Sequence, residues 1–417
     1  MSRRGDTSHM SVTGFQNRRL SELVEHAYRN VPFYRRKFDA AGVRPRHIGG
    51  IADLHLIPIT TRAELQNVPV SDIVARGTTP STLMHHKTSG STGEPMIIRR
   101  TWLEDRALGS LRAADLSAYG ISAADRIVSL GRFQPRKQNR LTRAKIVALR
   151  AMGRFTSESI SFQMPPERIL DTLVELKPDV LAGYPGVLDQ LAALVIESGH
   201  ARPTPRFIIT GSEVLTPAMA QRIETAFGGR LYDKYGANEL GRIASQCPAG
   251  SQYHVCGIGV IAEVLNNGRA AAPGEDGEVV VTGLHSFAMP FIRYHLGDTV
   301  TAGSERCDCG KQIQTIASIR GRCHDYVTLP DGRRLHLYIV TEAFYDMTFR
   351  WMRHYRVDQE SARSVVLRIV PRLPPADEEL ATIRARVTQI LGAEVNFRID
   401  VCAALPSVST SAAPKSF

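Results

Sequence analysis

The sequence predicts an α/β protein with a large N-terminal domain and a small α+β C-terminal domain. Three observations support this prediction. Short apolar runs that end in Gly or Pro alternate with helical segments through the middle of the chain, which is typical of a parallel sheet covered by helices. Between residues 253 and 301 the pattern changes to short strands separated by turn residues, which predicts an antiparallel, hairpin-rich subdomain. After Gly321 a new set of strands and a helix begins, in a chain of 417 residues that is too long for one simple core.

The expected elements of the large domain follow from their periodicity. Residues 20–38 carry apolar side chains at helical spacing, interrupted at Asn30 and Pro32, and predict an amphipathic N-terminal helix. Further helices are expected over 106–120, 165–176, 187–198 and 217–227, and buried strands over 125–131, 179–185 and 206–214. Ligands of doubly wound sheets bind beyond the carboxyl ends of the strands, where we expect residues 211–213 and 235–239 to lie.

The C-terminal domain is predicted from a second, shorter set of elements. The strands are expected near 354–359, 364–371 and 394–402, and the helix over 378–391. We place the domain boundary after Arg322, so that residues 1–322 form the large domain and residues 323–417 the small, mobile one.

Composition narrows the class of protein. The formal net charge is +11 and the pI is about 9.5, which suits an enzyme whose ligands are polyanions as well as it suits a nucleic-acid binder. No basic run is interleaved with aromatic residues, so we expect no nucleic-acid partner. Residues 1–16 lack the apolar region of a signal peptide and no stretch approaches the roughly 18 apolar residues of a membrane span, so we expect a cytoplasmic protein without a membrane partner.

The stretch from Lys87 to Pro95, KTSGSTGEP, predicts a phosphate-binding loop. Its glycines allow backbone N–H groups to approach an anion closely, and its Thr and Ser hydroxyls add donors. It is not the P-loop of nucleotide triphosphatases, because Glu94 follows the second glycine where that motif needs a lysine. A surface turn would have a similar composition, and this alternative stays open.

Four motifs in order resemble those of the adenylate-forming enzyme superfamily. Residues 88–95 resemble its phosphate loop, YGANE at 235–239 its Y-G-x-T-E motif, YHLGD at 294–298 its Y-x-x-G-D motif, and GRCHD at 321–325 its G-R-x-D-D motif. The segments NVPFYRRKF, LAGYP, PFIRYHLGD, CDCG and HYRVDQ are similar to the phenylacetate-CoA ligase group, which includes ligase-like proteins of capsule gene clusters. The resemblance covers nearly the whole chain and implies that the large domain is an adenylation domain with a hinge at residues 321–325.

The resemblance implies a two-step reaction. A small, aromatic carboxylic acid is activated with ATP as an acyl-adenylate, and coenzyme A then takes the acyl group. An amine, a carrier protein or another acceptor in place of coenzyme A is an alternative. A second alternative is a basic, zinc-containing binding protein without catalysis. Relatives commonly form homodimers, although no feature of this sequence demonstrates one.

The same resemblance implies the residues of the nucleotide site. The β- and γ-phosphates would be held by Thr88, Ser89, Gly90, Ser91, Thr92 and Gly93. The adenine would lie among Gly211, Ser212, Glu213, Asp233, Tyr235 and Gly236, with Tyr235 stacked on the base. Asp298 would bind the ribose, with Arg322 beside it.

Three further residues would act on the reacting groups. Glu239 would hold Mg²⁺, which prefers hard oxygen ligands, and Asn238 would contact the α-phosphate in place of the usual threonine. Lys415 would bridge the carboxylate and the nucleotide, although Ala-Pro replaces the Ser-Gly that normally precedes this lysine. The hinge also departs from the family, because His324 stands where an Asp or Lys is usual.

The spacing of four residues predicts a structural zinc site. Six cysteines are ordinary usage for a reducing compartment, where close spacings favour metal binding over disulfides. Cys247 and His254 precede Cys307 and Cys309, and tetrahedral zinc takes such thiolate and imidazole ligands. Cys256 is an alternative to His254. A group of unliganded core cysteines beside a surface histidine is the other interpretation of the same pattern.

Overall fold

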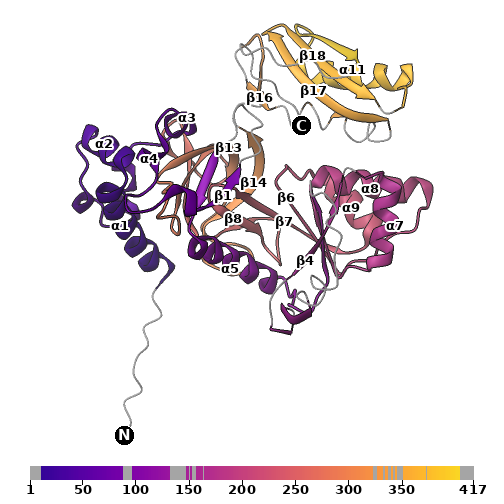
Figure 1. The fold of residues 1–417 in the computed structure, drawn as a ribbon. Coiled ribbons are helices and arrows are strands. Elements are labelled where there is room, and N and C mark those ends of the chain that lie inside the picture. The colour runs from indigo at the N-terminus through magenta and orange to yellow at the C-terminus, as the bar shows by residue number, and fades with distance from the viewer. Residues whose placement is uncertain are drawn as a thin grey trace. The chain divides into compact units, whose positions relative to one another are not determined.

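The computed structural model describes most of the chain. The described residues are 11–87, 96–131, 147–149, 151–152, 156–162, 164–322, 326–331, 334–336, 340, 343–344, 351–371 and 373–403. Figure 1 shows the helices and strands that they form. They group into two compact units. The first unit comprises residues 11–87, 96–115 and 235–319, and the second unit comprises the described residues of 116–234 and 320–403. No helix among these residues is both long enough and apolar enough to cross a bilayer.

The first unit begins with two helices separated at a proline. Helix α1 (Val12–Asn30) is capped by Ser11, whose hydroxyl accepts a hydrogen bond from the Gly14 N–H at 3.1 Å. Helix α2 (Pro32–Ala40) starts at Pro32, since a residue without an N–H group is tolerated at the first helical position. The predicted amphipathic helix and its interruption are therefore confirmed.

The strands of the first unit form an antiparallel sheet. Their order is β11-β10-β12-β13-β14-β9-β8. The bounds are β8 Gly241–Gln246, β9 Tyr253–Val255, β10 Val260–Asn266, β11 Arg269–Ala270, β12 Asp276–Gly283, β13 Tyr294–Ala302 and β14 Thr315–Arg322. The pairs β10–β12, β12–β13 and β8–β9 are antiparallel, which confirms the predicted hairpin-rich region. The unit also contains the hairpin β1 (Met84–Lys87) and β2 (Ile97–Arg100), helix α5 (Trp102–Ala118) and the short helices α3 (Arg62–Gln66) and α4 (Val70–Ile73).

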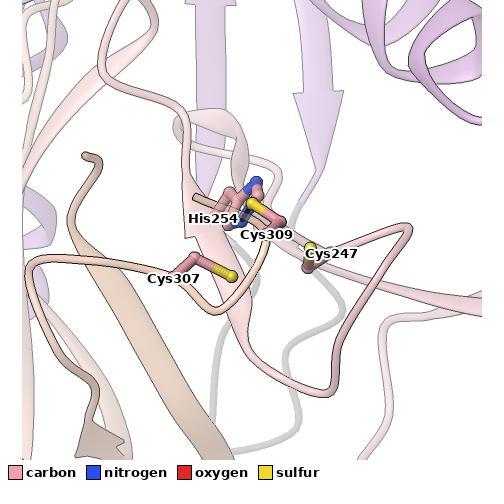
Figure 2. A group of neighbouring side chains, drawn as sticks. All are labelled: Cys247, His254, Cys307 and Cys309. Atoms are coloured by element: carbon pink, nitrogen blue, oxygen red, sulfur yellow. Dashed lines mark hydrogen bonds between the residues drawn. The ribbon is translucent and has the colours of Figure 1, made fainter. Parts of the chain in front are cut away.

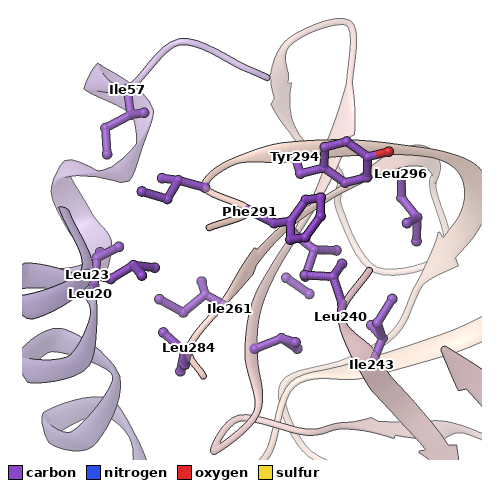
Figure 3. Close-up of a cluster of buried hydrophobic side chains, with 14 of the residues drawn as sticks. Leu20, Leu23, Ile57, Leu240, Ile243, Ile261, Leu284, Phe291, Tyr294 and Leu296 are labelled. Carbon is purple, nitrogen blue, oxygen red and sulfur yellow. The ribbon is translucent and has the colours of Figure 1, made fainter. Parts of the chain in front are cut away.

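Helix α1 packs against this sheet through one apolar face. Figure 3 shows Leu20 and Leu23 of α1 beside Ile261 of β10 and Leu284, and all four are fully or almost fully buried. The same core extends to Phe291, which precedes β13. Burial of such side chains contributes about 1.5–3 kcal/mol each. The packed core thereby fixes the strand that carries Tyr294 and Asp298.

Arg293 anchors the start of β13. Its guanidinium donates to both oxygens of Glu263 at 2.9–3.1 Å and to the carbonyls of His55 and Ile57 at 3.1 and 2.7 Å. Its own N–H donates to Thr282 Oγ1 at 2.9 Å. Arg293 has a φ of 48°, a strained value for a residue with a side chain, and these bonds hold it there.

The second unit contains a parallel sheet covered by helices. The strand order is β7-β6-β5-β3-β4, and each strand pairs in parallel with its neighbours in this order. The bounds are β3 Ile127–Gly131, β4 Ser157–Ser161, β5 Val180–Gly183, β6 Phe207–Gly211, β7 Arg230–Ala237, α7 Pro166–Leu176, α8 Pro185–Ser198 and α9 Pro217–Phe227. Apolar side chains of these strands and helices share one core. The predicted alternation of strands and helices is confirmed.

One boundary differs from the prediction. Residues 235–239 were expected beyond the end of a strand, but β7 runs through Tyr235 and Gly236 to Ala237, and only residues 238–240 form a turn before β8. A Cβ atom on Gly236 would lie 2.5 Å from the Gly241 carbonyl oxygen, so the glycine allows the two backbones to approach closely. This close approach extends the strand and places Glu239 in a tight hairpin turn.

The C-terminal residues have a core of their own. Strands β17 (Met352–Ser361) and β18 (Ser364–Pro371) pair antiparallel, and β19 (Asn396–Val401) adds to β18 in parallel. Helix α11 (Asp377–Leu391) shares an apolar cluster with these strands, to which the short β15 (Tyr326–Thr328) and β16 (Arg334–His336) also contribute. The predicted α+β elements are confirmed. The division into domains at residues 322 and 323 stays a prediction.

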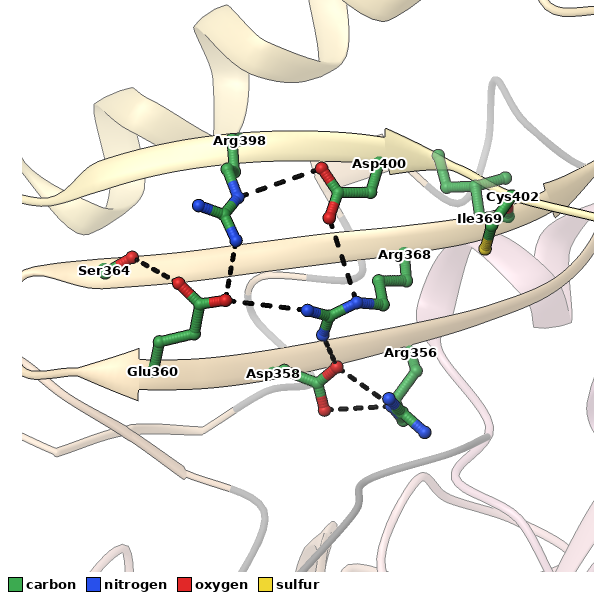
Figure 4. Close-up of polar contacts among 9 residues, drawn as sticks. All are labelled: Arg356, Asp358, Glu360, Ser364, Arg368, Ile369, Arg398, Asp400 and Cys402. Atoms are coloured by element: carbon green, nitrogen blue, oxygen red, sulfur yellow. Dashed lines mark hydrogen bonds and ion pairs between the residues drawn. The ribbon is translucent and has the colours of Figure 1, made fainter. Parts of the chain in front are cut away.

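Charged side chains cross this three-stranded sheet in an ion-pair network (Figure 4). Arg368 of β18 pairs with Asp358 of β17 and lies 3.5 Å from Glu360 Oε1 and 3.8 Å from Asp400 Oδ2. Arg398 donates to Glu360 at 2.6 Å. Opposite charges thus alternate across the strands, and such partly exposed pairs contribute about 1 kcal/mol or less each.

Candidate active site

Glu239 is a buried carboxylate in the turn between β7 and β8. It is 6% exposed, although a carboxylate prefers water. The Tyr294 hydroxyl donates to its Oε1 at 3.4 Å, and Arg62 Nη1 lies 4.0 Å from the same oxygen. A carboxylate that is sheltered from water and offers oxygen atoms has the chemistry of a Mg²⁺ ligand. These contacts lie within the first unit.

Tyr235 and Asp298 form a second buried pair in the first unit. The Tyr235 hydroxyl donates to Asp298 Oδ2 at 2.8 Å, and the two residues are 7% and 9% exposed. Gly297 precedes Asp298 with a φ of 82°, which a residue with a side chain adopts only with strain. The structure therefore brings together two predicted site residues from strands that are distant in sequence. The hydrogen bond from the phenol orients the carboxylate.

The predicted residues of the second unit lie at the carboxyl end of β6, directly after it, and in the middle of β7. Asp233 is 1% exposed and accepts a hydrogen bond of 2.6 Å from the hydroxyl of Thr210, its neighbour in register. Gly211 ends β6, and Ser212 follows with a φ of 71°. Glu213 accepts a hydrogen bond of 3.1 Å from the Gly186 N–H in the first turn of α8. A tight turn with ordered backbone groups thus follows β6, as expected.

Several predicted residues lie outside the described residues. These are Thr88, Ser89, Gly90, Ser91, Thr92, Gly93 and Lys415. Arg322 ends β14, but its side chain is also outside the description. Of the other predicted nucleotide residues, Tyr235, Gly236, Asn238, Glu239 and Asp298 lie in the first unit. Gly211, Ser212, Glu213 and Asp233 lie in the second.

Arg100 is a residue of this region that the sequence analysis missed. It ends β2, is 5% exposed, and donates from Nη2 to the carbonyl oxygen of Asn238. A signal was available in the segment IIRR, because side chains alternate along a strand and Arg100 shares a face with the buried Ile98. Arg62 was missed as well, since nothing in its helix marks it as a neighbour of Glu239.

The four predicted metal ligands lie together in the first unit. One ligand atom from each of Cys247, His254, Cys307 and Cys309 lies within 4.8 Å of all the others (Figure 2). Cys309 Sγ is 3.5 Å from His254 Nε2, and Cys247 and Cys307 are each 2% exposed. None of the described cysteines is in a disulfide. The predicted convergence of these residues from two distant segments is thus present in the structure.

Cys256, the alternative ligand to His254, is not part of the cluster. Cys256 Sγ accepts a hydrogen bond of 2.5 Å from Arg242 and is not part of the group, so His254 is the residue that joins it. Burial lowers the pKa of His254, and the charge of Lys311 lowers it further. Both effects favour the neutral imidazole, which is the form that binds metals.

Comparisons with known proteins show that the chain is similar to AMP-binding enzymes and to phenylacetate-coenzyme A ligases. The family model described as AMP-binding enzyme matches residues 149–289. A phenylacetate-coenzyme A ligase of Thermus thermophilus is 26% identical over 347 residues, which are 76% of this chain and 72% of that protein. A phenylacetate-coenzyme A ligase of Escherichia coli is 29% identical over 69% of this chain and 66% of its own length. Protein CapK of Staphylococcus aureus is 22% identical over 75% of this chain and 68% of its own length.

Solved structures share the fold. A 2-hydroxyisobutyryl-CoA ligase in the postadenylation state, in complex with R3-HIB-AMP, superposes with a TM-score of 0.75 at 22% identity, covering 93% of this chain and 85% of that one. An anthranilate CoA ligase in complex with anthranoyl-AMP gives a TM-score of 0.56 at 16% identity, covering 86% of this chain and 72% of that one. At these identities the likeness establishes the fold.

Proposed function

We infer that this chain is an adenylate-forming enzyme, similar to the phenylacetate-CoA ligases, and that it works as an AMP-forming acid–thiol ligase. The carboxylate of a small organic acid attacks the α-phosphorus of ATP and pyrophosphate leaves. The thiol of coenzyme A then attacks the acyl carbon and AMP leaves. One observation carries this proposal: the buried Glu239 lies in the same unit as the hydrogen-bonded pair of Tyr235 and Asp298. These three residues stand at the motif positions that the family uses to bind the metal and the nucleotide.

The described residues suit the roles that this reaction needs. Glu239 would hold Mg²⁺, which supplies charge neutralisation between the two anions that must meet. Asp298 would accept hydrogen bonds from the two ribose hydroxyls, while the Tyr235 hydroxyl keeps its carboxylate oriented. Asp233 and the turn at 211–213 would face the adenine. Catalysis of this kind depends mostly on positioning and on stabilising charge.

The remaining roles fall partly on residues that the structure does not describe. Thr88, Ser89, Gly90, Ser91, Thr92 and Gly93 would cradle the β- and γ-phosphates, and Arg322 would lie beside the ribose. Asn238 would contact the α-phosphate. Residues 323–417 would form the small domain that pivots at 321–325 between an adenylating and a thioester-forming pose. An aromatic acid is the proposed substrate class, in line with the phenylacetate-coenzyme A ligases among the relatives.

Lys415 is proposed to bridge the attacking carboxylate and the nucleotide. We expect Lys415→Ala to slow adenylation by about a hundredfold or more, because the variant lacks the cation that would lie between the attacking carboxylate and the phosphates of ATP. Thioester formation from a supplied acyl-adenylate should be much less affected. Equal rates of pyrophosphate release in single-turnover experiments with mutant and wild type would remove Lys415 from the mechanism.

We further propose that Cys247, His254, Cys307 and Cys309 bind one structural Zn²⁺. The donor set, three thiolates and one imidazole, is that of closed tetrahedral zinc sites, which leave no position for substrate. The ligands join strand β9 and the connection that precedes it to the loop between β13 and β14. The metal would therefore stabilise the hairpin-rich part of the first unit.

The identity of the acyl acceptor is tested by measuring AMP release with coenzyme A present or absent. A thiol ligase should release AMP in step with acyl-CoA when coenzyme A is supplied, and should retain acyl-adenylate without it. AMP release that is indifferent to coenzyme A, but rises with an amine or a carrier protein, would instead support transfer to another acceptor. Mass spectrometry of the products identifies which acyl bond forms.

A further inference from the structure

Arg100 is a buried cation next to the turn that carries the candidate magnesium ligand Glu239. It ends β2, which pairs with β1, and these two strands flank the proposed phosphate-binding segment in sequence. The residue is 5% exposed. Burying a guanidinium is unfavourable unless its charge and its N–H groups are matched by nearby acceptors. Its contacts should therefore reveal what the buried charge does.

The contacts of Arg100 connect the β1–β2 hairpin to the turn that carries Glu239. Nη2 donates to the carbonyl oxygen of Asn238. Nη1 lies 3.8 Å from Asp105 Oδ1, an oxygen that is also 2.9 Å from His86 Nε2 on β1. Nε has no hydrogen-bond partner among the described residues. All these residues belong to the first unit.

The charges around Arg100 include the candidate magnesium ligand itself. Burial lowers the pKa of Arg100, and the carboxylates of Asp105, Glu104 and Glu239 oppose that effect. Glu104 is already engaged, because it accepts hydrogen bonds from the N–H groups of Phe287 and Ala288 at 2.6 and 2.8 Å. Three carboxylates therefore stabilise the positive charge of Arg100, and the candidate magnesium ligand Glu239 is one of them.

The acceptor carbonyl has a specific consequence for Glu239. It belongs to the peptide bond that joins Asn238 to Glu239, and a peptide unit is planar and rigid. Holding the oxygen of that unit fixes the orientation of the Glu239 N–H and Cα, and with them the direction in which the carboxylate leaves the turn. A charged donor holds a carbonyl more strongly than a neutral one does.

We propose that Arg100 is a positioning residue for the binding of magnesium–ATP, acting by fixing the turn at residues 238–240 and the direction of the Glu239 carboxylate. This inference rests on the proposed function. It assigns Arg100 no contact with substrate. It predicts that loss of the guanidinium weakens the use of magnesium–ATP and leaves the use of the acid unchanged.

The neighbouring Arg99 provides a matched control. Arg99 carries the same charge on the same strand, but alternation places it on the opposite face, where its Nη1 donates to the nearby Ile97 carbonyl at 3.1 Å. Pyrophosphate exchange would be measured for wild type, Arg100→Met, Arg100→Lys and Arg99→Met, with magnesium–ATP and acid varied separately. Circular dichroism and thermal unfolding would check that each variant is folded.

We expect Arg100→Met to raise the KM for magnesium–ATP by about tenfold or more, because the variant loses a hydrogen bond from a charged donor. The KM for the acid should change less than about twofold in all variants, Arg99→Met should resemble wild type, and Arg100→Lys should be intermediate because it keeps the charge but loses the planar fork. If Arg100→Met does not fold, Arg100→Lys compared with Arg99→Lys carries the test.

Three negative outcomes are distinguishable. An active wild type whose KM for magnesium–ATP is matched by both Arg100 variants would overturn the role of Arg100 and leave the proposed function intact. Equal increases in the KM values for the acid and for magnesium–ATP would also overturn it, because they would indicate a general structural role. A wild type that exchanges no pyrophosphate with any acid would overturn the proposed function and this inference with it.

Discussion

Replacement of Glu239 with glutamine is expected to slow acid-dependent adenylation by about a hundredfold or more, because removing one group that stabilises developing charge has effects of that size. Glutamine keeps the volume of the side chain and can still accept a hydrogen bond from Tyr294. It removes the anionic oxygen that a hard divalent cation prefers. The rate of pyrophosphate release at saturating acid, measured as a function of magnesium concentration, checks this expectation.

Glu278→Gln is the control for that experiment. Its carboxylate is 52% exposed and pairs with His295 on the sheet surface, so the same chemical change should alter the rate less than about twofold. Thermal unfolding of both variants shows whether a slower rate results from the loss of the metal-binding carboxylate or from unfolding of the protein. Wild-type rates and wild-type magnesium dependence in a folded Glu239→Gln protein would show that this carboxylate does not bind the metal.

Replacement of Cys307 with serine is expected to have the largest effect on stability. Wild-type protein should contain about one zinc per chain, and the variant should contain far less, because serine is a poor zinc ligand at neutral pH. The unfolding temperature should fall by about 10 °C or more, since structural zinc supplies several kcal/mol and each kcal/mol corresponds to about 2–4 °C in a unit of this size. Elemental analysis and calorimetry give the two measurements.

Cys402→Ser is the matched control for the zinc experiment. Cys402 lies after β19, where its thiol donates to the Ile369 carbonyl at 3.5 Å (Figure 4), and it is not one of the four predicted ligands. It should retain the wild-type zinc content and change the unfolding temperature only slightly. Wild-type protein purified with zinc in the medium but carrying none, together with an unchanged stability of Cys307→Ser, would contradict the zinc proposal.

The fold was predictable where local chemistry decides it. Pro32 separates α1 from α2 because it has no N–H group, and the apolar runs of β5 and β6 end at glycines as buried parallel strands often do. The end of β7 was not predictable in this way. It depends on how closely the backbone at Gly236 approaches Gly241, which is a property of the folded hairpin.

The candidate site was predictable where a motif carries it and not where a long-range contact does. The four metal ligands and the Tyr235–Asp298 pair were expected from spacing and resemblance, and the structure brings each set together. Arg100 meets Asn238 across 138 positions of the sequence, and one arginine among many does not reveal such a partner. The alternation along the strand indicates that Arg100 is buried. The partner of its charge depends on tertiary contacts, which the strand pattern does not show.

The most direct test of the account is acid-dependent exchange of labelled pyrophosphate into ATP by the full-length wild-type protein. We expect exchange that requires magnesium and one member of a panel of small aromatic acids, that proceeds without coenzyme A, and that is lost in Glu239→Gln. Failure of every acid to promote exchange, in folded protein saturated with magnesium and ATP, would contradict the assignment of this chain as an adenylate-forming enzyme.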